Sequence, residues 1–201
     1  MNLSELRAEV VTLTNRADLD LTGQILLAVR RATLKLHTID YFYKDLSEFT
    51  VAFSSSISQQ AFDTISNVPR WRSAKYFRFY DLATATPGKF FKKLDSQNVL
   101  DDYGVSSNNI WYQAGDILQL RYEANFQYML AGVYLYPDIA AATYTSWIAV
   151  SYPYAIVLEA SAMILKMTGK ADEARMIRED NNENIALLKI SGIQENPEVN
   201  L

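Results

Sequence analysis

Few side chains in this chain could do acid–base or metal chemistry. His37 is the single histidine, and Asp40 follows it closely enough for a catalytic His–Asp pair. A histidine at the end of an expected helix more often interacts with the C-terminal helix dipole, and we favour that structural role. One histidine and no cysteine exclude a metal site with two imidazoles, a thiolate metal site and a disulfide framework.

Asp101 and Asp102 are the other candidates for catalysis. Adjacent residues on a regular element point apart, so a metal site or a glycosidase pair would need a carboxylate from elsewhere in the fold. A turn before Gly104 is the favoured interpretation. No glycine-rich phosphate loop occurs among the 7 glycines. We therefore predict a protein that is not an enzyme and holds no cofactor or metal; a hydrolase built on Asp101, Asp102 or His37 is the least favoured hypothesis.

The aromatic residues divide the chain into the elements that must position any site. All 3 Trp, 13 Tyr and 9 Phe lie between Tyr41 and Tyr154, whereas both ends are rich in aliphatic residues. Aromatic residues favour strands, and Ala, Leu and Met favour helices. This predicts an α+β fold: a bundle of about four helices, two N-terminal and two C-terminal, with an inserted antiparallel β sandwich or barrel-like domain. The expected boundaries are residues 1–40 and 145–190 for a helical docking domain, 41–144 for the β insertion and 191–201 for a flexible C-terminal tail.

Two amphipathic helices are expected before residue 40. Asn2 and Glu5 form a capping-box pattern at the start of the first helix. A turn over residues 16–21 follows, with Asp18 or Asp20 placed to cap the second helix. The apolar faces are Leu3, Leu6, Val10 and Leu13 in the first helix, and Ile25, Leu26, Val29, Thr33 and Leu36 in the second, which carries Arg30, Arg31 and Lys35 on its other side.

Alternation with period two begins after residue 40 and predicts about six strands. In the clearest run, Phe77 and Phe79 fall on one face, and Tyr76, Arg78 and Tyr80 fall on the other. The expected strands include residues 49–53, 61–65, 76–81 and 129–136, and a hairpin over 109–122 that turns at Ala114-Gly115-Asp116.

Two further helices are expected after Trp147. Apolar residues surround the first one, so we predict that it is central and buried, and that Gly169 ends it. A membrane span is disfavoured because Pro153 interrupts the apolar run and Glu159 would cost about 3 kcal/mol in a bilayer. The last helix, over residues 171–189, has a seam formed by Ala174, Ile177, Asn181, Ile185 and Leu188. Asn181 either fixes helix register from within this seam or, in the simpler account, faces solvent.

The net charge of −4 is unevenly distributed. Residues 66–93 are strongly basic and residues 94–168 are acidic, a pattern suited to contact between identical subunits, although solvated strand charges explain it equally well. Trp and Arg often anchor interfaces, which draws attention to Pro69-Arg70-Trp71-Arg72, with a core role for Trp71 slightly favoured. The full set of interface candidates is Arg70, Trp71, Arg72, Trp111, Tyr112, Asn181, Ile185 and Ile193.

The order and spacing of several short motifs resemble one family along nearly the full chain. The motifs are Arg30-Arg31-Ala32-Thr33, Pro69-Arg70-Trp71-Arg72, Asp102-Tyr103-Gly104, Trp111-Tyr112 with Gly115-Asp116, Tyr134 with Tyr136-Pro137, Trp147 ahead of Pro153, and the break at Gly169. Together they resemble the head-to-tail adaptor, or head-completion, proteins of tailed bacteriophages. No single motif is specific to that family.

The resemblance implies a structural protein of the virion, assembled in the host cytoplasm and placed at the capsid vertex. Such adaptors form a ring, commonly of twelve copies, between the portal protein and a tail protein of the nozzle or stopper kind. Double-stranded DNA passes through the ring without sequence-specific binding, and no membrane is involved. The main alternative is a carbohydrate- or receptor-binding tail module that uses Trp71, Trp111 and nearby tyrosines as a stacking platform.

Overall fold

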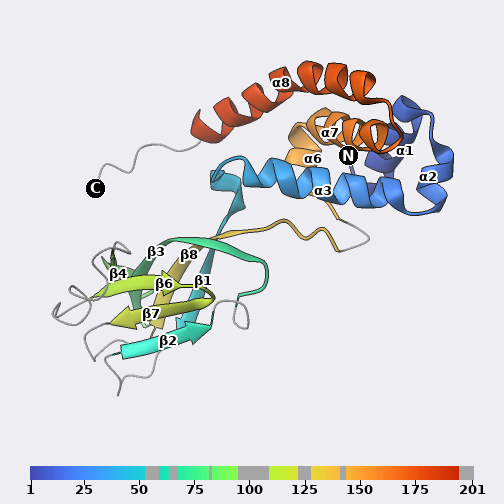
Figure 1. Ribbon diagram of the computed structural model, residues 1–201. Coiled ribbons are helices and arrows are strands. Elements are labelled where there is room, and N and C mark those ends of the chain that lie inside the picture. Colours follow the sequence, from blue (N-terminus) through green and yellow to red (C-terminus); the bar gives the residue numbers. More distant parts are fainter. Residues whose placement is uncertain are drawn as a thin grey trace. The chain divides into compact units, whose positions relative to one another are not determined.

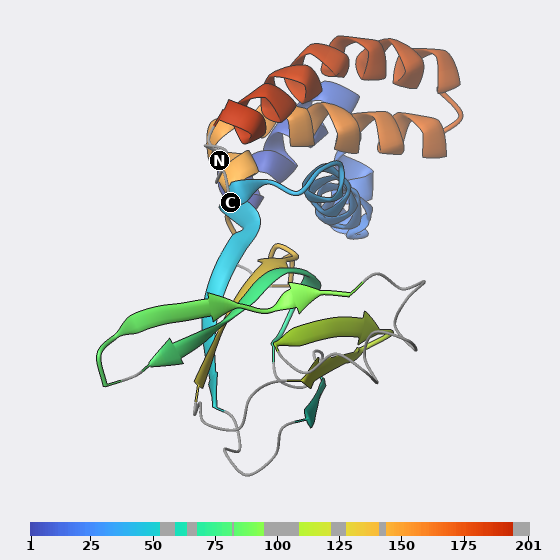
Figure 2. The ribbon, with the colours of Figure 1, turned by 90° about the vertical axis from the view of Figure 1, so that its left-hand side faces the viewer.

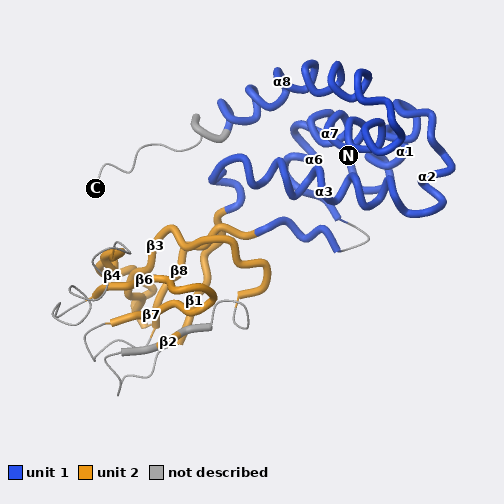
Figure 3. Tube along the Cα trace, in the orientation of Figure 1, with its two compact units in different colours: residues 1–45, 136–201 blue, residues 46–135 orange. Residues whose placement is uncertain are grey.

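The chain folds into two compact units of different secondary structure. The computed structural model describes residues 1–52, 59–63, 68–81, 83–94, 109–121, 128–140 and 144–194. A helical unit comprises Met1–Asp45 and Tyr136–Leu201, and a strand unit comprises Leu46–Leu135 (Figure 3). The fold is therefore α+β, with a strand unit inserted between the two parts of the helical unit (Figure 1). Residue 53, the last of the expected strand 49–53, lies outside the described residues, as do the candidates Asp101 and Asp102.

The boundaries between the units differ from the expected ones at residues 40 and 145. Phe42 is 2% exposed and Tyr144 is 3% exposed, and both lie in the hydrophobic core of the helical unit. Ile139 packs against the same core. The aromatic content of these flanking segments suggested strands, but their side chains fill gaps between helices instead.

The first helix of the helical unit begins with a capping box. The side chain of Asn2 accepts a hydrogen bond from the backbone N–H of Glu5 at 3.0 Å, and the Glu5 carboxylate accepts one from the backbone N–H of Asn2 at 2.9 Å, which confirms the expected start. The elements are α1 (Leu3–Thr14), α2 (Ala17–Leu21), α3 (Gln24–Thr38), the 3-10 turn η1 (Tyr43–Asp45), α6 (Trp147–Ser151), α7 (Pro153–Met167) and α8 (Ala171–Gln194).

Several local expectations for the N-terminal helices were wrong. The expected turn over residues 16–21 contains the short helix α2. Neither aspartate caps α3, whose N-cap is Gly23 with a positive φ of 76°. Asp18 pairs with Arg16, and Asp20 pairs with Arg7 of α1, so both carboxylates bind guanidinium groups instead. Leu13 is 43% exposed. Thr14 is buried instead, because it follows Val10 by four residues and so continues the buried stripe of α1.

Helix α7 is the centre of the helical unit. Nine of its residues are buried, on nearly every side, as the all-round apolar pattern predicted. It packs against α1, α3, α6 and α8. Pro153 stands at the first turn, where its missing N–H is tolerated, and Gly169 ends the helix region with a φ of 83°. No helix among the described segments combines the length and apolar character needed to cross a membrane.

Tyr144 provides a test of this core, because its burial makes the free energy of unfolding depend on pH. Burial raises the pKa of its hydroxyl above the usual value. The phenol of the unfolded chain loses its proton near pH ~10, before that of the folded chain, so the free energy of unfolding should fall as pH rises from there toward the folded pKa. Below that range both states are neutral and Tyr144 adds no pH dependence. We expect Tyr144→Phe to remove this part of the fall in urea titrations between pH 8 and 11, whereas Tyr154→Phe, at a 50% exposed position, should keep it. Equal slopes for the two variants would contradict the prediction.

The strand unit contains two four-stranded sheets in its described part. One sheet has the order β1-β8-β3-β4 and the other β2-β7-β6-β5. All pairs are antiparallel except β5 with β6, which is parallel, and these strands close no barrel, so the barrel-like alternative was wrong. The strands are β1 (Leu46–Ala52), β2 (Gln59–Asp63), β3 (Trp71–Asp81), β4 (Thr86–Phe90), β5 (Lys92–Lys93), β6 (Ile110–Ala114), β7 (Ile117–Arg121) and β8 (Tyr128–Leu135).

One hydrophobic core joins side chains of both sheets. Phe77 and Phe79 of β3 point into it, as their alternation predicted, while Tyr76 and Arg78 lie on the other face. The ring of Trp111 from β6 meets that of Phe77 edge to face, with 4.8 Å between centroids. The expected hairpin is β6 and β7, which turn at Gly115 with a positive φ of 59°.

Candidate functional site

Helix α8 is buried along one side only. Ala174, Asn181 and Leu188 are buried, and Ile177 and Ile185 are half-buried, so the seam expected from the sequence is confirmed. This seam packs on α7. The helix runs to Gln194, so the expected end at residue 189 was wrong, and residues 191–194 belong to the helix rather than to a tail. The backbone of Ile193 therefore lies in α8, and residues 195–201 lie outside the described residues.

Asn181 is an internal residue of the α7–α8 contact. Its side chain is 0% exposed, and Nδ2 donates a hydrogen bond to the carbonyl oxygen of Ala155 at 3.0 Å. Its Oδ1 atom is buried and has no hydrogen-bond partner among the described residues. The account in which Asn181 faces solvent was therefore wrong. A buried amide with a single partner on α7 fits a role in setting helix register.

The opposite side of α8 presents apolar and acidic side chains to solvent. Met176 is 56% exposed, Leu187 is 49% exposed and Ile190 is 50% exposed. Glu179 and Glu183 are exposed between them, at spacings of three and four residues that place them on one helical stripe. We call Met176, Glu179, Glu183, Leu187 and Ile190 the α8 face.

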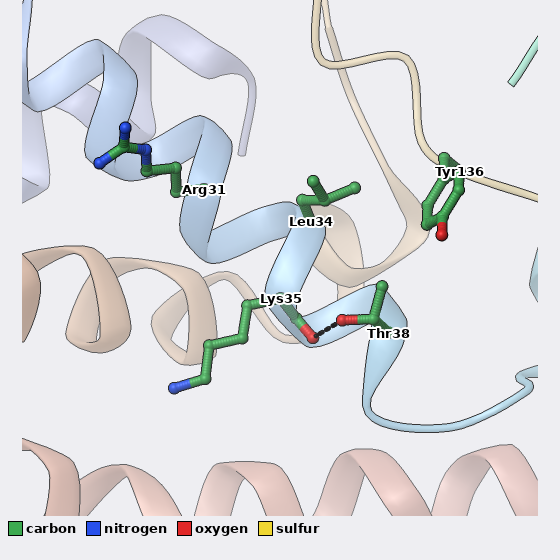
Figure 4. Close-up of a pocket in the computed structure, with 5 residues that line it drawn as sticks. All are labelled: Arg31, Leu34, Lys35, Thr38 and Tyr136. Atoms are coloured by element: carbon green, nitrogen blue, oxygen red, sulfur yellow. Dashed lines mark hydrogen bonds between the residues drawn. The ribbon is translucent and has the colours of Figure 1, made fainter. Parts of the chain in front are cut away.

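Helix α3 presents a second outward stripe, which is apolar and basic. Leu27 is 41% exposed, and Arg31, Lys35 and Thr38 are exposed on the same side, opposite the buried stripe of α3. Leu34 and Tyr136 border a shallow hollow of about 400 Å³ beside them (Figure 4). We call Leu27, Arg31, Leu34, Lys35 and Thr38 the α3 face.

The two faces belong to helices that pack on α7 from different sides. In both views α7 lies between α3 and α8 (Figures 1 and 2). Glu159 of α7, only 2% exposed, links the three helices: Lys35 Nζ lies 2.7 Å from its Oε1, and Arg178 Nη2 of α8 lies 3.7 Å from the same atom. This buried carboxylate fixes the spacing of α3 and α8 on the central helix.

His37 makes a buried polar contact that joins α3 to α6. Its Nδ1 lies 2.8 Å from Oδ1 of Asp45, and Trp147 Nε1 donates to the same oxygen at 2.8 Å. Asp40, the partner of His37 in the disfavoured catalytic pair, instead accepts a hydrogen bond from the backbone of Tyr41. His37 is 2% exposed, so a substrate cannot reach its imidazole without opening the core. This contact is suited to holding the end of α3 in place.

The structure scatters the interface candidates of the strand unit. Trp111 is 2% exposed and is a core residue, so its ring cannot anchor a partner or a sugar in this fold. Trp71 is half-buried and packs against the core of the strand unit, which agrees with the core role that the sequence slightly favoured for it. Arg70 is exposed with a positive φ of 63°, while Arg72 and Tyr112 are half-buried. These residues do not form one patch.

The basic segment of the strand unit is partly engaged with its own rings. The guanidinium of Arg78 lies 5.5 Å from the centroid of Phe90 and 5.8 Å from that of Tyr76. Lys93 Nζ lies 5.2 Å from the centroid of the Trp111 ring. Contacts of this kind hold these charges against rings of their own unit, an account that differs from both the subunit contact and the solvated strand charges considered from the sequence.

The sequence placed Arg31 and Lys35 on the outer side of α3, but the residues of the α3 and α8 faces were not among the interface candidates selected from it. A signal for the α3 face was present, because Leu27, Arg31 and Leu34 follow a helical spacing. Within the described part of the chain, acidic and histidine side chains form no group of three suited to a metal ion. Neither models of known protein families nor curated proteins give a match to this sequence.

Proposed function

We propose that this chain is a structural virion protein: a head-to-tail adaptor whose copies form a ring between the portal and the tail. The observation that carries the proposal is the form of α8. A helix of 24 residues buries one side on α7 and exposes Met176, Leu187 and Ile190 on the other. Apolar side chains gathered on one outward stripe favour a protein partner.

The finer architecture of the proposal is a four-helix bundle that carries a β sandwich. The bundle consists of α1, α3, α7 and α8, with α7 at its centre. The sandwich is supported by the single core to which Phe77 of one sheet and Trp111 of the other contribute. A rigid helical unit with a separate strand unit suits a connector that binds different neighbours.

In this proposal the helical unit and the C-terminal segment bind the portal, and the strand unit faces the nozzle or stopper protein of the tail. The ring, of twelve copies as the resemblance implies, surrounds the DNA channel. The net charge of −4 supports this, because a wall that repels phosphate lets DNA slide without sticking. The alternative, a glycan-binding module, is weakened because Trp111 is buried.

Electron microscopy of the protein mixed with its cognate portal protein tests the proposal. We expect rings of this chain stacked on one end of the portal ring. The protein alone and the portal alone serve as references. Portals that stay bare at every mixing ratio would remove the adaptor function.

A truncation tests whether the C-terminal segment contributes to portal binding without contributing to the fold. Deletion of residues 195–201 leaves every described element intact, so thermal unfolding should match that of the full chain. We expect the truncated protein to bind the portal at least ~10-fold more weakly in sedimentation assays, since a terminal anchor of a few apolar and charged residues contributes one or more kcal/mol. Undiminished portal binding would exclude this segment as an anchor.

A further inference from the structure

We infer that the α8 face of one copy packs antiparallel on the α3 face of the next copy, and that this contact builds the ring. The inference rests on the proposed function and names the surfaces that the assembly uses. Both faces are helical stripes with exposed leucines, Leu187 on α8 and Leu27 on α3. Each stripe lacks a covering element in the described structure, and each is long enough for several turns of contact.

The charges of the two faces are complementary. The α3 face carries Arg31 and Lys35, and the α8 face carries Glu179 and Glu183. Lys35 also pairs with Glu159 of its own chain, and Glu179 Oε1 lies 4.0 Å from Arg175 Nε, so the complementarity rests mainly on Arg31 and Glu183. Arg31 is exposed and makes no ion pair with any described residue of its own chain. Like-charged faces would repel, so this pattern disfavours α3 on α3 and α8 on α8.

An antiparallel arrangement matches the two faces position by position. Residues one helical turn apart on α3 meet residues one turn apart on α8, with the direction reversed. Apolar side chains then face each other at one end, and opposite charges face each other in the middle. The pairs are Leu27 with Leu187, Arg31 with Glu183, Lys35 with Glu179, and Thr38 with Met176.

The position of the faces explains why the contact would propagate. Because α7 lies between α3 and α8, the two faces are on different sides of the helical unit (Figure 2). A contact between different surfaces of identical copies is heterologous, so each added copy leaves a new free face. Such a series closes when the rotation between neighbours divides a full circle, which is the geometry of a ring.

Engineered disulfides test the pairing directly, since the chain has no cysteine. Full-length Arg31→Cys is mixed with full-length Glu183→Cys under oxidising conditions at the highest concentration the protein reaches. We expect a disulfide-linked dimer of the two variants, and a ladder of covalent oligomers from the double variant Arg31→Cys/Glu183→Cys. Disulfides form only when the two Cα atoms approach within ~7 Å, so a disulfide between positions 31 and 183 reports a specific contact.

Asn182→Cys is the matched control for position. Asn182 is exposed and adjacent to Glu183, but it lies about 100° around the helix from it. We expect about tenfold less dimer from Arg31→Cys with Asn182→Cys than from the Glu183 pair. Equal yields for the two pairs would overturn the inference, as would an Arg31→Cys homodimer in excess, which indicates a two-fold contact between α3 faces.

Charge reversal gives a second measurement that does not depend on cysteine. Arg31→Glu and Glu183→Arg should each weaken self-association about tenfold in sedimentation equilibrium, and the double variant should restore it. Self-association that neither variant changes would overturn the inference. Rings on the portal without the 31–183 disulfide would overturn the pairing and leave the adaptor function standing. A specific 31–183 disulfide in a protein that does not bind the portal would support the pairing and remove the adaptor function.

Discussion

Replacement of Phe77 by alanine is expected to unfold the strand unit and leave the helical unit folded. Phe77 is 0% exposed and packs edge to face on Trp111 at the centre of the core that joins the two sheets. Removing a buried phenylalanine costs about 3–5 kcal/mol through lost apolar contact and the cavity that remains. That loss is a large share of the ~5–13 kcal/mol expected for a unit of this size.

The helical unit should survive because it has a core of its own. Its buried cluster is drawn from the helices and their flanking segments, and the cluster that contains Phe77 is drawn from the strand unit alone. The chain leaves and re-enters the helical unit at Asp45 and Tyr136, so a disordered insertion can be accommodated as a long loop. Loop-closure entropy rises only slowly with loop length.

Tryptophan fluorescence and far-UV circular dichroism separate the two outcomes. Trp71 and Trp111 report on the strand unit, and Trp147 reports on the helical unit. We expect Phe77→Ala to expose the first two rings while the helical signal is kept. Phe90→Ala, at a 43% exposed position on the outer face of the same sheet, is the control and should change neither signal strongly. Loss of both signals together in Phe77→Ala would show that the units fold as one.

The elements that the sequence predicted well are those with a long periodic pattern. The seam of α8 was placed residue by residue, because a strongly charged helix leaves few apolar positions from which to choose. The alternation in β3 likewise identified Phe77 as internal. Trp111 was harder to place, since Trp111 and Tyr112 are both aromatic and a strand pattern alone does not say which face meets the core.

Other features depended on contacts that local sequence does not encode. The C-terminal segment was expected to be a tail because it is polar, but α8 continues to Gln194 and passes through Gly192, since a single glycine costs only about 1 kcal/mol in a helix. For His37, the sequence suggested the helix dipole or, as the disfavoured alternative, the nearby carboxylate of Asp40. The intervening 3-10 turn η1 instead carries Asp45 back to the imidazole. The α3 face was identified only in part. Arg31 and Lys35 were placed on the outer side of the helix, but Leu27 and Leu34 beside them were not assigned to either side.

Replacement of Asp45 by alanine is expected to destabilise the helical unit by about 3–5 kcal/mol, because it removes the acceptor shared by a donor of the buried His37 and one of the half-buried Trp147. The carboxylate Oδ1 binds His37 Nδ1 and Trp147 Nε1, both at 2.8 Å. Leaving those donors unpaired in the core carries most of the cost. Asp45 is also the last residue of the helical unit before β1, so the contact fixes the point at which the chain leaves it.

Asp40→Ala is the matched control for this prediction, since Asp40 is exposed and bonds only locally in the described structure. Urea denaturation followed by far-UV circular dichroism of the helices should show a large fall in the midpoint for Asp45→Ala and a change within about 0.5 kcal/mol for Asp40→Ala. Trp147→Phe keeps a ring against Phe42, whose centroid lies 5.1 Å away, but removes one donor. The double variant Asp45→Ala/Trp147→Phe should therefore be less destabilised than the sum of the two single variants, because neither donor nor acceptor of that bond remains. Additive losses would mean that Asp45 acts through His37 alone.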